Sequence, residues 1–324
     1  MARETGDIGR VYRCLPEYHY RAVWEDNKTV RFCPKGEDPT PLELPPNQCE
    51  FYDVGINTKC NAMCEFCYVS AEKGGENYLG ICEAWREFSK TWYRRNIAGV
   101  IATNAPVLIA IGSTGEPTIH PEFIEFLKTV RGTKVIPNYT TNGLILGYCG
   151  SDREKIKERD NLLEATEKYC SAVAVSLGNK SIREVALRAI ENLIPRDVYV
   201  VTHHIISNKE SVDEFLRFRD KYGDKIYYYT LLPLAKSGRS KEEMSMEVYE
   251  YLETELLKKR LAGESIGNIS FGAKFIPFVR AHGNILGASL VPEGYYSKNI
   301  ILKKDKVIIT PSSFDLTPIM TVKL

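Results

Sequence analysis

Hydrophobic positions along the chain fall into two patterns, short nearly continuous apolar runs and longer stretches in which apolar residues recur every three or four positions. The short runs predict buried strands, and the longer stretches predict amphipathic helices that cover a sheet. The strand candidates are residues 51–57, 107–112, 134–140, 172–177, 198–206 and 225–232. The helix candidates are residues 81–96, 120–131, 154–169, 181–193, 210–222 and 240–262. This alternation is typical of β-α units around a parallel sheet, so the sequence predicts an α/β protein with close to six such units.

The repeated pattern divides the chain into a core at residues 51–235 and two flanks, residues 1–50 and 236–324. In the first flank, Asp26-Asn27 predicts a hairpin turn between two short β-rich runs. In the last flank, the stretch 299–310 predicts two further strands with a turn at Lys304-Asp305. We interpret both flanks as β-containing extensions that cover the core.

Local signals mark where two of the helices begin. The sequence Ser181-Ile182-Arg183-Glu184 fits a capping box, and Pro121 fits a first helical turn. The stretch 90–95 interleaves basic and aromatic residues, which suits either a solvated helix face or contact with RNA. We favour the helix face.

Composition and charge exclude several classes of protein. The chain has 324 residues, of which 44% are hydrophobic and 26% charged, and this mixture is that of a folded globular protein. Lys plus Arg number 43 against 42 for Asp plus Glu, so the net charge of +1 predicts no extended nucleic-acid footprint. No apolar run approaches the roughly 20 residues that span a bilayer. The charged N-terminus also lacks the apolar core of a signal peptide, so we expect a cytoplasmic protein without membrane contact.

Three of the nine cysteines lie close together directly after the first predicted strand. Cys60, Cys64 and Cys67 have the spacing C-x3-C-x2-C, and three thiolates in one loop can bind three irons of a four-iron cluster. A structural zinc site usually has four ligands in two separated pairs, and the sequence has no second C-x2-C or H-x3-H pair to complete one. A non-catalytic iron-sulfur or zinc protein remains the alternative from another class.

This cysteine loop resembles that of the radical S-adenosylmethionine (SAM) superfamily. Cys60, Cys64 and Cys67 match the family motif residue by residue, and Phe66 matches the aromatic position beside the adenine. The resemblance covers roughly residues 50–235 and implies a partial (β/α)6 barrel whose [4Fe-4S] cluster binds SAM. It also implies reductive cleavage of SAM to a 5′-deoxyadenosyl radical that abstracts hydrogen from a substrate. A flavodoxin- or ferredoxin-type electron donor is implied as a partner.

Further residues at the ends of the predicted strands resemble SAM-binding positions of the family. Ser113-Thr114-Gly115-Glu116-Pro117 resembles the loop that contacts the SAM amino group, although Thr114 stands where the family usually has Gly. Thr141-Asn142-Gly143 resembles a motif of the peptide-modifying and molybdenum-cofactor branches, and Ser176 occupies a frequent SAM-contacting position. Asn142-Gly143 also fits a simple turn, and Ser176 also fits a satisfied strand-end hydroxyl. The resemblance therefore predicts Phe66, Thr114, Gly115, Glu116, Asn142 and Ser176 as cofactor-binding residues.

The substrate and its further contacts are less constrained. His203 and His204 are consecutive in a predicted strand, so one faces the barrel interior and the other faces the helices. The loop 236–239 resembles the one after the sixth strand in the same branch, and its basic residues suit either an anionic group or solvent. We prefer a peptide or protein substrate because of the branch resemblance. A nucleoside, RNA or small metabolite is the alternative.

The remaining cysteines do not extend the metal site. Many peptide-modifying relatives carry auxiliary clusters on a C-terminal extension, but the last cysteine here is Cys170, so we expect none of that type. Cys14, Cys33 and Cys49 precede the core with spacings that match no ligand pattern, and we interpret them as buried apolar residues. A hydrogen-donating role for Cys149 is an alternative to a plain loop thiol.

Overall fold

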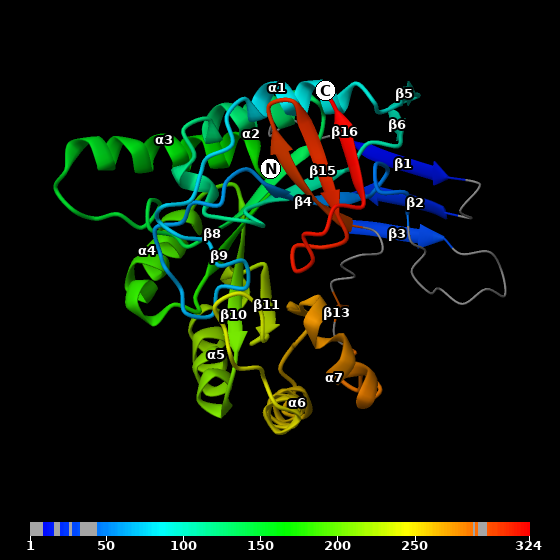
Figure 1. Ribbon diagram of the computed structural model, residues 1–324. Helices are drawn as coiled ribbons and strands as arrows, with labels where there is room; N and C mark the ends of the chain where they lie inside the picture. Colours follow the sequence, from blue (N-terminus) through cyan, green and yellow to red (C-terminus); the bar gives the residue numbers. More distant parts are fainter. Residues whose placement is uncertain (1–8, 16–19, 26–27, 33–43, 288, 291–296) are drawn as a thin grey trace.

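The structure is a computed structural model, and it describes residues 9–15, 20–25, 28–32, 44–287, 289–290 and 297–324. Its main feature is an open sheet with the strand order β13-β12-β11-β10-β9-β8-β7-β4-β14-β15-β16 (Figure 1). The six central strands are β4 (Phe51–Gly55), β7 (Leu108–Ile111), β8 (Ile136–Thr141), β9 (Ala172–Ser176), β10 (Tyr199–Ile206) and β11 (Tyr228–Pro233). They run parallel to one another, which confirms the predicted β-α core. The sheet does not close into a barrel within the described residues.

Two parallel strands extend the sheet beyond β11, and three strands extend it beyond β4. The extension beyond β11 consists of β12 (Ile269–Phe271) and β13 (Ser289–Leu290). The extension beyond β4 consists of β14 (Ser297–Lys303), β15 (Lys306–Thr310) and β16 (Met320–Lys323). The predicted strand pair with its turn at Lys304-Asp305 is therefore confirmed, and it joins the core sheet directly.

Seven α-helices lie within the described residues, and most of them cover the outer face of the sheet (Figure 1). They are α1 (Ile81–Ser89), α2 (Phe123–Gly132), α3 (Arg153–Tyr169), α4 (Arg183–Leu193), α5 (Lys209–Tyr222), α6 (Met246–Leu261) and α7 (Ile276–Ala281). Outward strand residues such as Val54, Ile109 and Val175 are fully buried beneath them. No helix among the described residues is both long enough and apolar enough to cross a bilayer.

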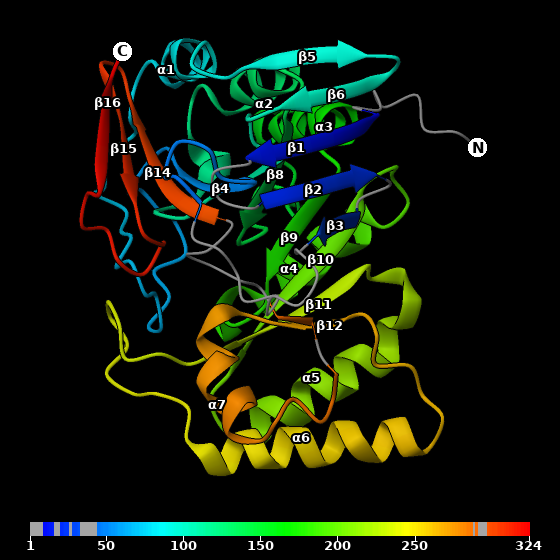
Figure 2. The same cartoon turned by 90° about the vertical axis from the view of Figure 1, so that its right-hand side faces the viewer.

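The N-terminal flank belongs to a second sheet of five strands beside the core (Figure 2). Its order is β3-β2-β1-β6-β5, with bounds β1 (Arg10–Leu15), β2 (Tyr20–Glu25), β3 (Lys28–Phe32), β5 (Arg94–Ile97) and β6 (Val100–Thr103). The antiparallel pair β2–β3 confirms the predicted hairpin, although its turn at Asp26-Asn27 lies outside the described residues. The buried Arg13 joins this sheet to the core, because its Nη2 donates to the carbonyls of Gln48 at 2.7 Å and Asn104 at 3.1 Å.

The helix predicted for residues 81–96 ends early, at Ser89. Trp92 then turns inward and packs its ring 5.2 Å from those of Trp85 and Phe88, measured between centroids. The chain continues as strand β5 from Arg94, so the basic and aromatic residues at 90–95 do not form a helix face. The helical period of the sequence did not predict this early end of the helix, because tertiary packing of the aromatic rings overrides helix propensity here.

The capping box predicted at Ser181 is wrong. The side chain of Asn179 accepts hydrogen bonds from the Ser181 backbone N–H at 3.0 Å and from its hydroxyl at 2.8 Å. This contact begins a short 3₁₀ turn, and helix α4 starts only at Arg183, without a side-chain cap. Pro121 likewise precedes α2 by two positions, and the helix predicted from residue 240 begins at Met246.

Candidate functional site

The segment between β4 and α1 forms a loop, residues 56–78, that we call the cysteine loop. It folds back on itself through short bridges that pair Asn57 with Asn77 and Lys59 with Glu72. The backbone N–H of Cys60 donates to the Glu72 carbonyl at 2.9 Å, and Met63 has a positive φ of 52°. Backbone pairing thus gives the loop a defined conformation, which places its three cysteines at the carboxyl end of the first core strand.

A cavity of about 270 Å³ lies beneath the cysteine loop, at the carboxyl ends of the core strands. Eight of the nine predicted site residues line it, namely Cys60, Cys64, Cys67, Phe66, Gly115, Glu116, Asn142 and Ser176. Thr114 does not line the cavity. Residues that the sequence did not single out for this place also contribute, among them Asp53, Thr140, Asn179, Ile205 and Phe314.

The three thiols face this one cavity from different points of the loop. Burial raises the pKa of Cys60 and Cys64, and the neighbouring thiols contribute to the same direction. The amide of Asn179 donates to the Cys64 sulfur at 3.3 Å, and this contact opposes part of that rise. Within the described chain, no three Cys, His, Asp or Glu side chains converge as a group that could hold a metal ion.

The buried side chain of Glu116 connects the loop after β7 to the end of β8 through hydrogen bonds. Its Oε1 accepts hydrogen bonds from the Thr118 backbone N–H and hydroxyl and from the Thr141 hydroxyl, at 3.2, 2.6 and 2.8 Å. Its Oε2 accepts the backbone N–H of Asn142 at 2.7 Å. Burial raises the pKa of Glu116, and these hydrogen bonds counteract part of the rise. The carboxylate therefore positions the Thr-Asn-Gly turn, and Oε2 keeps capacity for one more donor from the cavity.

Gly115 and Thr114 fix the same loop against the cysteine loop. A Cβ on Gly115 would lie 2.5 Å from Oδ1 of Asn57 and 2.7 Å from the Lys59 carbonyl oxygen, so only glycine fits. The hydroxyl of Thr114 donates to the Asn57 carbonyl at 2.6 Å. Thr114 thus points toward the base of the cysteine loop, and the cofactor role predicted for it stays a prediction.

Asn142 and Phe66 each join the cavity wall to the cysteine loop. The amide of Asn142 donates to Oδ1 of Asn61 at 2.8 Å and lies 4.0 Å from the Cys60 sulfur. The Phe66 ring packs over Gly178, where a Cβ would come within 2.8 Å of Cζ of Phe66 and 2.6 Å of Cγ1 of Ile205. Phe66 therefore presents an aromatic surface at the edge of the cavity, above the ends of β9 and β10.

Comparison with known proteins identifies the fold. No family model and no curated protein matches the sequence. Among solved structures, the chain is similar to Streptococcus suis SuiB bound to its precursor peptide SuiA, with a TM-score of 0.59 and 12% identity. That alignment covers 83% of this chain and 60% of SuiB. The chain shares the fold of SuiB.

Two further SuiB structures agree with this comparison. SuiB bound to S-adenosylmethionine gives a TM-score of 0.55, and SuiB alone gives 0.56, both at 14% identity. Each alignment covers 82% of this chain and 60% of SuiB, so the chain spans about three fifths of the SuiB length.

The loop after β11 clamps the cysteine loop in this SuiB-like fold. Nε and Nη1 of Arg239 donate to the carbonyls of Cys64 and Ala71, at 2.9 and 2.8 Å. The Arg239 backbone N–H donates to the Cys67 carbonyl at 3.0 Å, and Gly238 approaches so closely that a Cβ would lie 2.3 Å from that oxygen. Arg239 therefore holds the cysteine loop, whereas Lys236, the other basic residue of this loop, is exposed to solvent.

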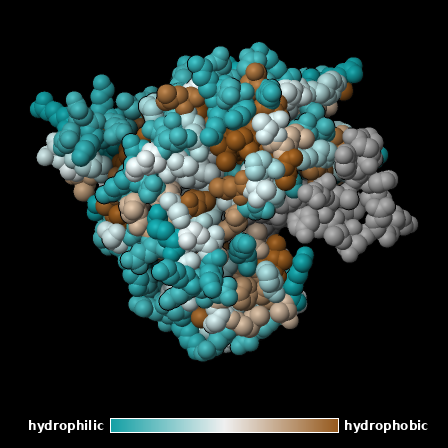
Figure 3. Space-filling model, in the orientation of Figure 1, coloured by the Kyte–Doolittle hydropathy of each residue, from teal (hydrophilic) through white to brown (hydrophobic). Residues whose placement is uncertain are grey.

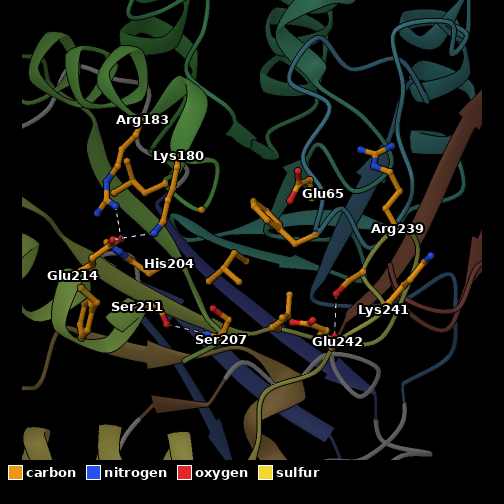
Figure 4. A pocket seen from close by; sticks show the side chains of 17 residues that line it. Glu65, Lys180, Arg183, His204, Ser207, Ser211, Glu214, Arg239, Lys241 and Glu242 are labelled. Carbon is orange, nitrogen blue, oxygen red and sulfur yellow. Dashed lines mark hydrogen bonds and ion pairs between the residues drawn. The ribbon is translucent and has the colours of Figure 1, made fainter. Parts of the chain in front are cut away.

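A second cavity of about 390 Å³ shares Phe66, Gly178 and Ile205 with the first (Figure 4). On one of its walls, Lys180 and Arg183 both point toward Glu214 and form ion pairs with it. The guanidinium of Arg239 lies on the opposite side of this cavity. The two cavities are thus neighbours that meet at Phe66, Gly178 and Ile205.

None of the described cysteines outside the cysteine loop lines either cavity. Cys49 is buried as predicted and Cys170 is buried too, whereas Cys14 on β1 is only half-buried, unlike the prediction, and Cys149 is exposed. Cys33 lies outside the described residues.

Hydrophobic residues gather across the middle of the face in Figure 3, between hydrophilic upper and lower ends.

Sequence reasoning missed Asn179 and left the roles of Arg239 and the histidines open. A helix-capping residue directly after a strand was the available signal for Asn179, but Ser181 competed for that role. His203 lines the first cavity, whereas the buried His204 packs against the rings of Phe215 and Phe218 and lines the second cavity (Figure 4).

Proposed function

We propose that the protein is a radical SAM enzyme in which Cys60, Cys64 and Cys67 hold a [4Fe-4S] cluster. The observation that carries this proposal is the meeting of the three thiols with Gly115, Glu116 and Asn142 around one cavity at the strand ends. Thiolates are the ligands that iron-sulfur clusters need, and the fold shared with SuiB supports the same reading. When bound, the cluster would supply the electron that cleaves S-adenosylmethionine to methionine and a 5′-deoxyadenosyl radical.

The chain's own residues would orient the cofactor and exclude water. Glu116, held by four hydrogen bonds, offers the free capacity of Oε2 to an ammonium group. Phe66 gives a flat apolar surface for a nucleobase. Phe314, from the last flank, lines the cavity, and its ring centroid lies 4.5 Å from that of the tilted Tyr68 ring, a contact that would help to keep solvent from the reacting atoms.

A peptide or protein is the substrate class that we favour. SuiB has been solved with its precursor peptide SuiA, and the present chain shares its fold. The second cavity adjoins the first across Phe66 and carries charged and hydroxyl side chains along its walls. This neighbouring space would accommodate the residues of a peptide next to the cofactor.

The test is anaerobic reconstitution with iron and sulfide, followed by dithionite and S-adenosylmethionine and a chromatographic assay for 5′-deoxyadenosine. We expect the product from the native chain and none from the Cys60/Cys64/Cys67→Ala variant. Cys82→Ala is the matched control, because Cys82 lies on α1 away from the cavity. SAM cleavage retained by the triple variant would contradict the proposal.

A further inference from the structure

Arg239 contacts the cysteine loop without lining the first cavity. It lines the second cavity instead. Its side chain donates to the carbonyls of Cys64 and Ala71, and its backbone N–H donates to the carbonyl of Cys67. One residue thus holds the backbone of two of the three cysteines to which we assign the cluster. Any effect of Arg239 on the cluster would therefore pass through the cysteine loop.

The guanidinium of Arg239 has no counter-ion within the described part of the chain. The hydrogen bonds of its side chain go to carbonyl oxygens, and its Nη2 is buried without a partner among the described residues. Glu65, which also lines the second cavity, is exposed and forms no ion pair with it there. Arginine stays protonated in proteins, and charges that are kept from water are normally paired. No described carboxylate therefore neutralises the charge of Arg239.

Other partly buried arginines of this protein do have such partners. Arg183, on another wall of the second cavity, forms an ion pair with Glu214. Arg219 on α5 forms one with Glu264 at 3.2 Å. The unpaired guanidinium of Arg239 differs from both, and what distinguishes its place is the cysteine loop.

Covalent geometry places the charge of Arg239 near the Cys64 sulfur. Nε of Arg239 lies 2.9 Å from the Cys64 carbonyl oxygen. The carbonyl oxygen of a cysteine lies within about 5 Å of its own sulfur, so Nε and this sulfur are within about 8 Å of each other. Thiolates are the form of cysteine that binds metal, and a four-iron cluster on three thiolates has a net negative charge. Opposite charges at this separation attract appreciably where water has little access.

This arrangement suits Arg239 as the counter-ion of the cluster. Reduction by one electron, with dithionite as the donor that is oxidised, adds a negative charge to the cluster and moves no proton. A fixed cation nearby stabilises the more negative, reduced form. We propose that Arg239 is a positioning residue whose charge raises the reduction potential of the cluster on Cys60, Cys64 and Cys67, an inference that rests on the proposed function.

The test is a potentiometric titration of the anaerobically reconstituted protein without S-adenosylmethionine, followed by electron paramagnetic resonance of the reduced cluster. Arg239→Gln removes the charge and keeps an amide that can donate to the Cys64 carbonyl. We expect it to retain the native iron content and to lower the equilibrium constant for one-electron reduction roughly tenfold. That change equals a fall of about 59 mV in the midpoint potential. An unchanged potential, or loss of the iron, would overturn the inference.

Arg239→Lys separates the charge from the hydrogen-bonding geometry. Lysine keeps the positive charge and lacks the planar fork that reaches two carbonyls. We therefore expect its reduction equilibrium to stay within about threefold of the native value. A purely structural role predicts the opposite, because the loss of the fork would then matter as much in Arg239→Lys as in Arg239→Gln. Equal falls in potential for the two variants would thus overturn the inference.

Lys236→Gln is the matched control on the same loop. It also removes one positive charge, but Lys236 is exposed, so water and salt screen its charge. We expect the reduction equilibrium to stay within about twofold of the native value. A fall as large as that of Arg239→Gln would show that only the net charge of the protein matters, and it would overturn the role of Arg239.

The same samples distinguish this inference from the proposed function. A native protein that takes up no four-iron cluster would contradict both. A native protein whose cluster signal responds to S-adenosylmethionine, with the same potential in Arg239→Gln, would contradict the role of Arg239 alone.

Discussion

The rim of the sheet at β7 and β8 and its inner wall at β9 and β10 use their polar side chains in opposite ways. At the rim, Glu116 accepts four hydrogen bonds from its own chain. On the wall, Ser176 and His203 face the cavity and form none with described residues. Substitution at the rim should therefore alter the stability of the protein, and substitution on the wall should alter the binding of ligands.

The largest expected effect is that of Glu116→Ala. The substitution leaves the Asn142 N–H and the hydroxyls of Thr118 and Thr141 buried without their acceptor, so we expect a loss of about 3 kcal/mol in the free energy of unfolding. Ser176→Ala, its counterpart on the wall, should change that value by less than about 0.5 kcal/mol. Urea unfolding of both variants measures the difference, and equal losses in the free energy of unfolding would contradict the expected difference between rim and wall.

Gly115→Ala should have the next largest effect. The added Cβ would lie within 2.8 Å of three atoms of Asn57 and Lys59, so the loop must shift at a cost of about 2 kcal/mol. Gly74→Ala is the matched control on the cysteine loop, because no atom lies within 4 Å of its added Cβ. Thermal unfolding should separate the two variants, and a Gly115→Ala protein as stable as Gly74→Ala would contradict the close approach.

On the inner wall, His203 should affect how the free energy of unfolding depends on pH. The pKa of His203 falls from 6.5 to about 4 on burial, so the unfolded chain binds a proton in this window that the folded chain does not. The native protein therefore loses stability as the pH falls from about 6.5 toward 4. His203→Phe should lessen the loss between pH 7 and pH 5 by up to about 2 kcal/mol. Urea titrations at both pH values measure it, and an unchanged loss would show that His203 is not buried in its neutral form.

Thr114→Val should have the smallest effect at the rim. It removes the hydroxyl that donates to the Asn57 carbonyl and keeps the shape of the side chain, so we expect a loss of about 1 kcal/mol. Thr114→Ser keeps the donor and should stay closer to the native value. Weaker S-adenosylmethionine binding without any loss of stability would instead favour the cofactor role that the sequence predicts for Thr114.

The sequence predicted the core strands and the cysteine loop because both depend on local pattern. Continuous apolar runs bounded by turns fixed all six central strands, and the cysteine spacing marked the loop after the first. Strand β12 near one edge of the core sheet and strand β6 in the second sheet were harder to predict, since β12 has only three residues and β6 pairs with β1 from a distant part of the chain. Short strands with long-range partners leave little periodic signal.

The contacts that position the candidate site could not be read from the sequence. The carboxylate of Glu116 reaches Thr141 and Asn142, about 25 residues away, and Arg239 reaches Cys64 across 175 positions. Such contacts depend on how the strand ends are brought together. The parity rule did place the two histidines on opposite faces of the strand, but only the lining of the first cavity identified His203 as the inward one.

The most direct test of the central claim is electron paramagnetic resonance of the reduced, reconstituted protein before and after addition of S-adenosylmethionine. A four-iron cluster with one iron that lacks a protein ligand should give a signal from the native chain, and S-adenosylmethionine should change its shape. Cys64→Ala should lose both the signal and the change. A cluster signal that S-adenosylmethionine leaves unaltered, or one that persists in Cys64→Ala, would contradict the account.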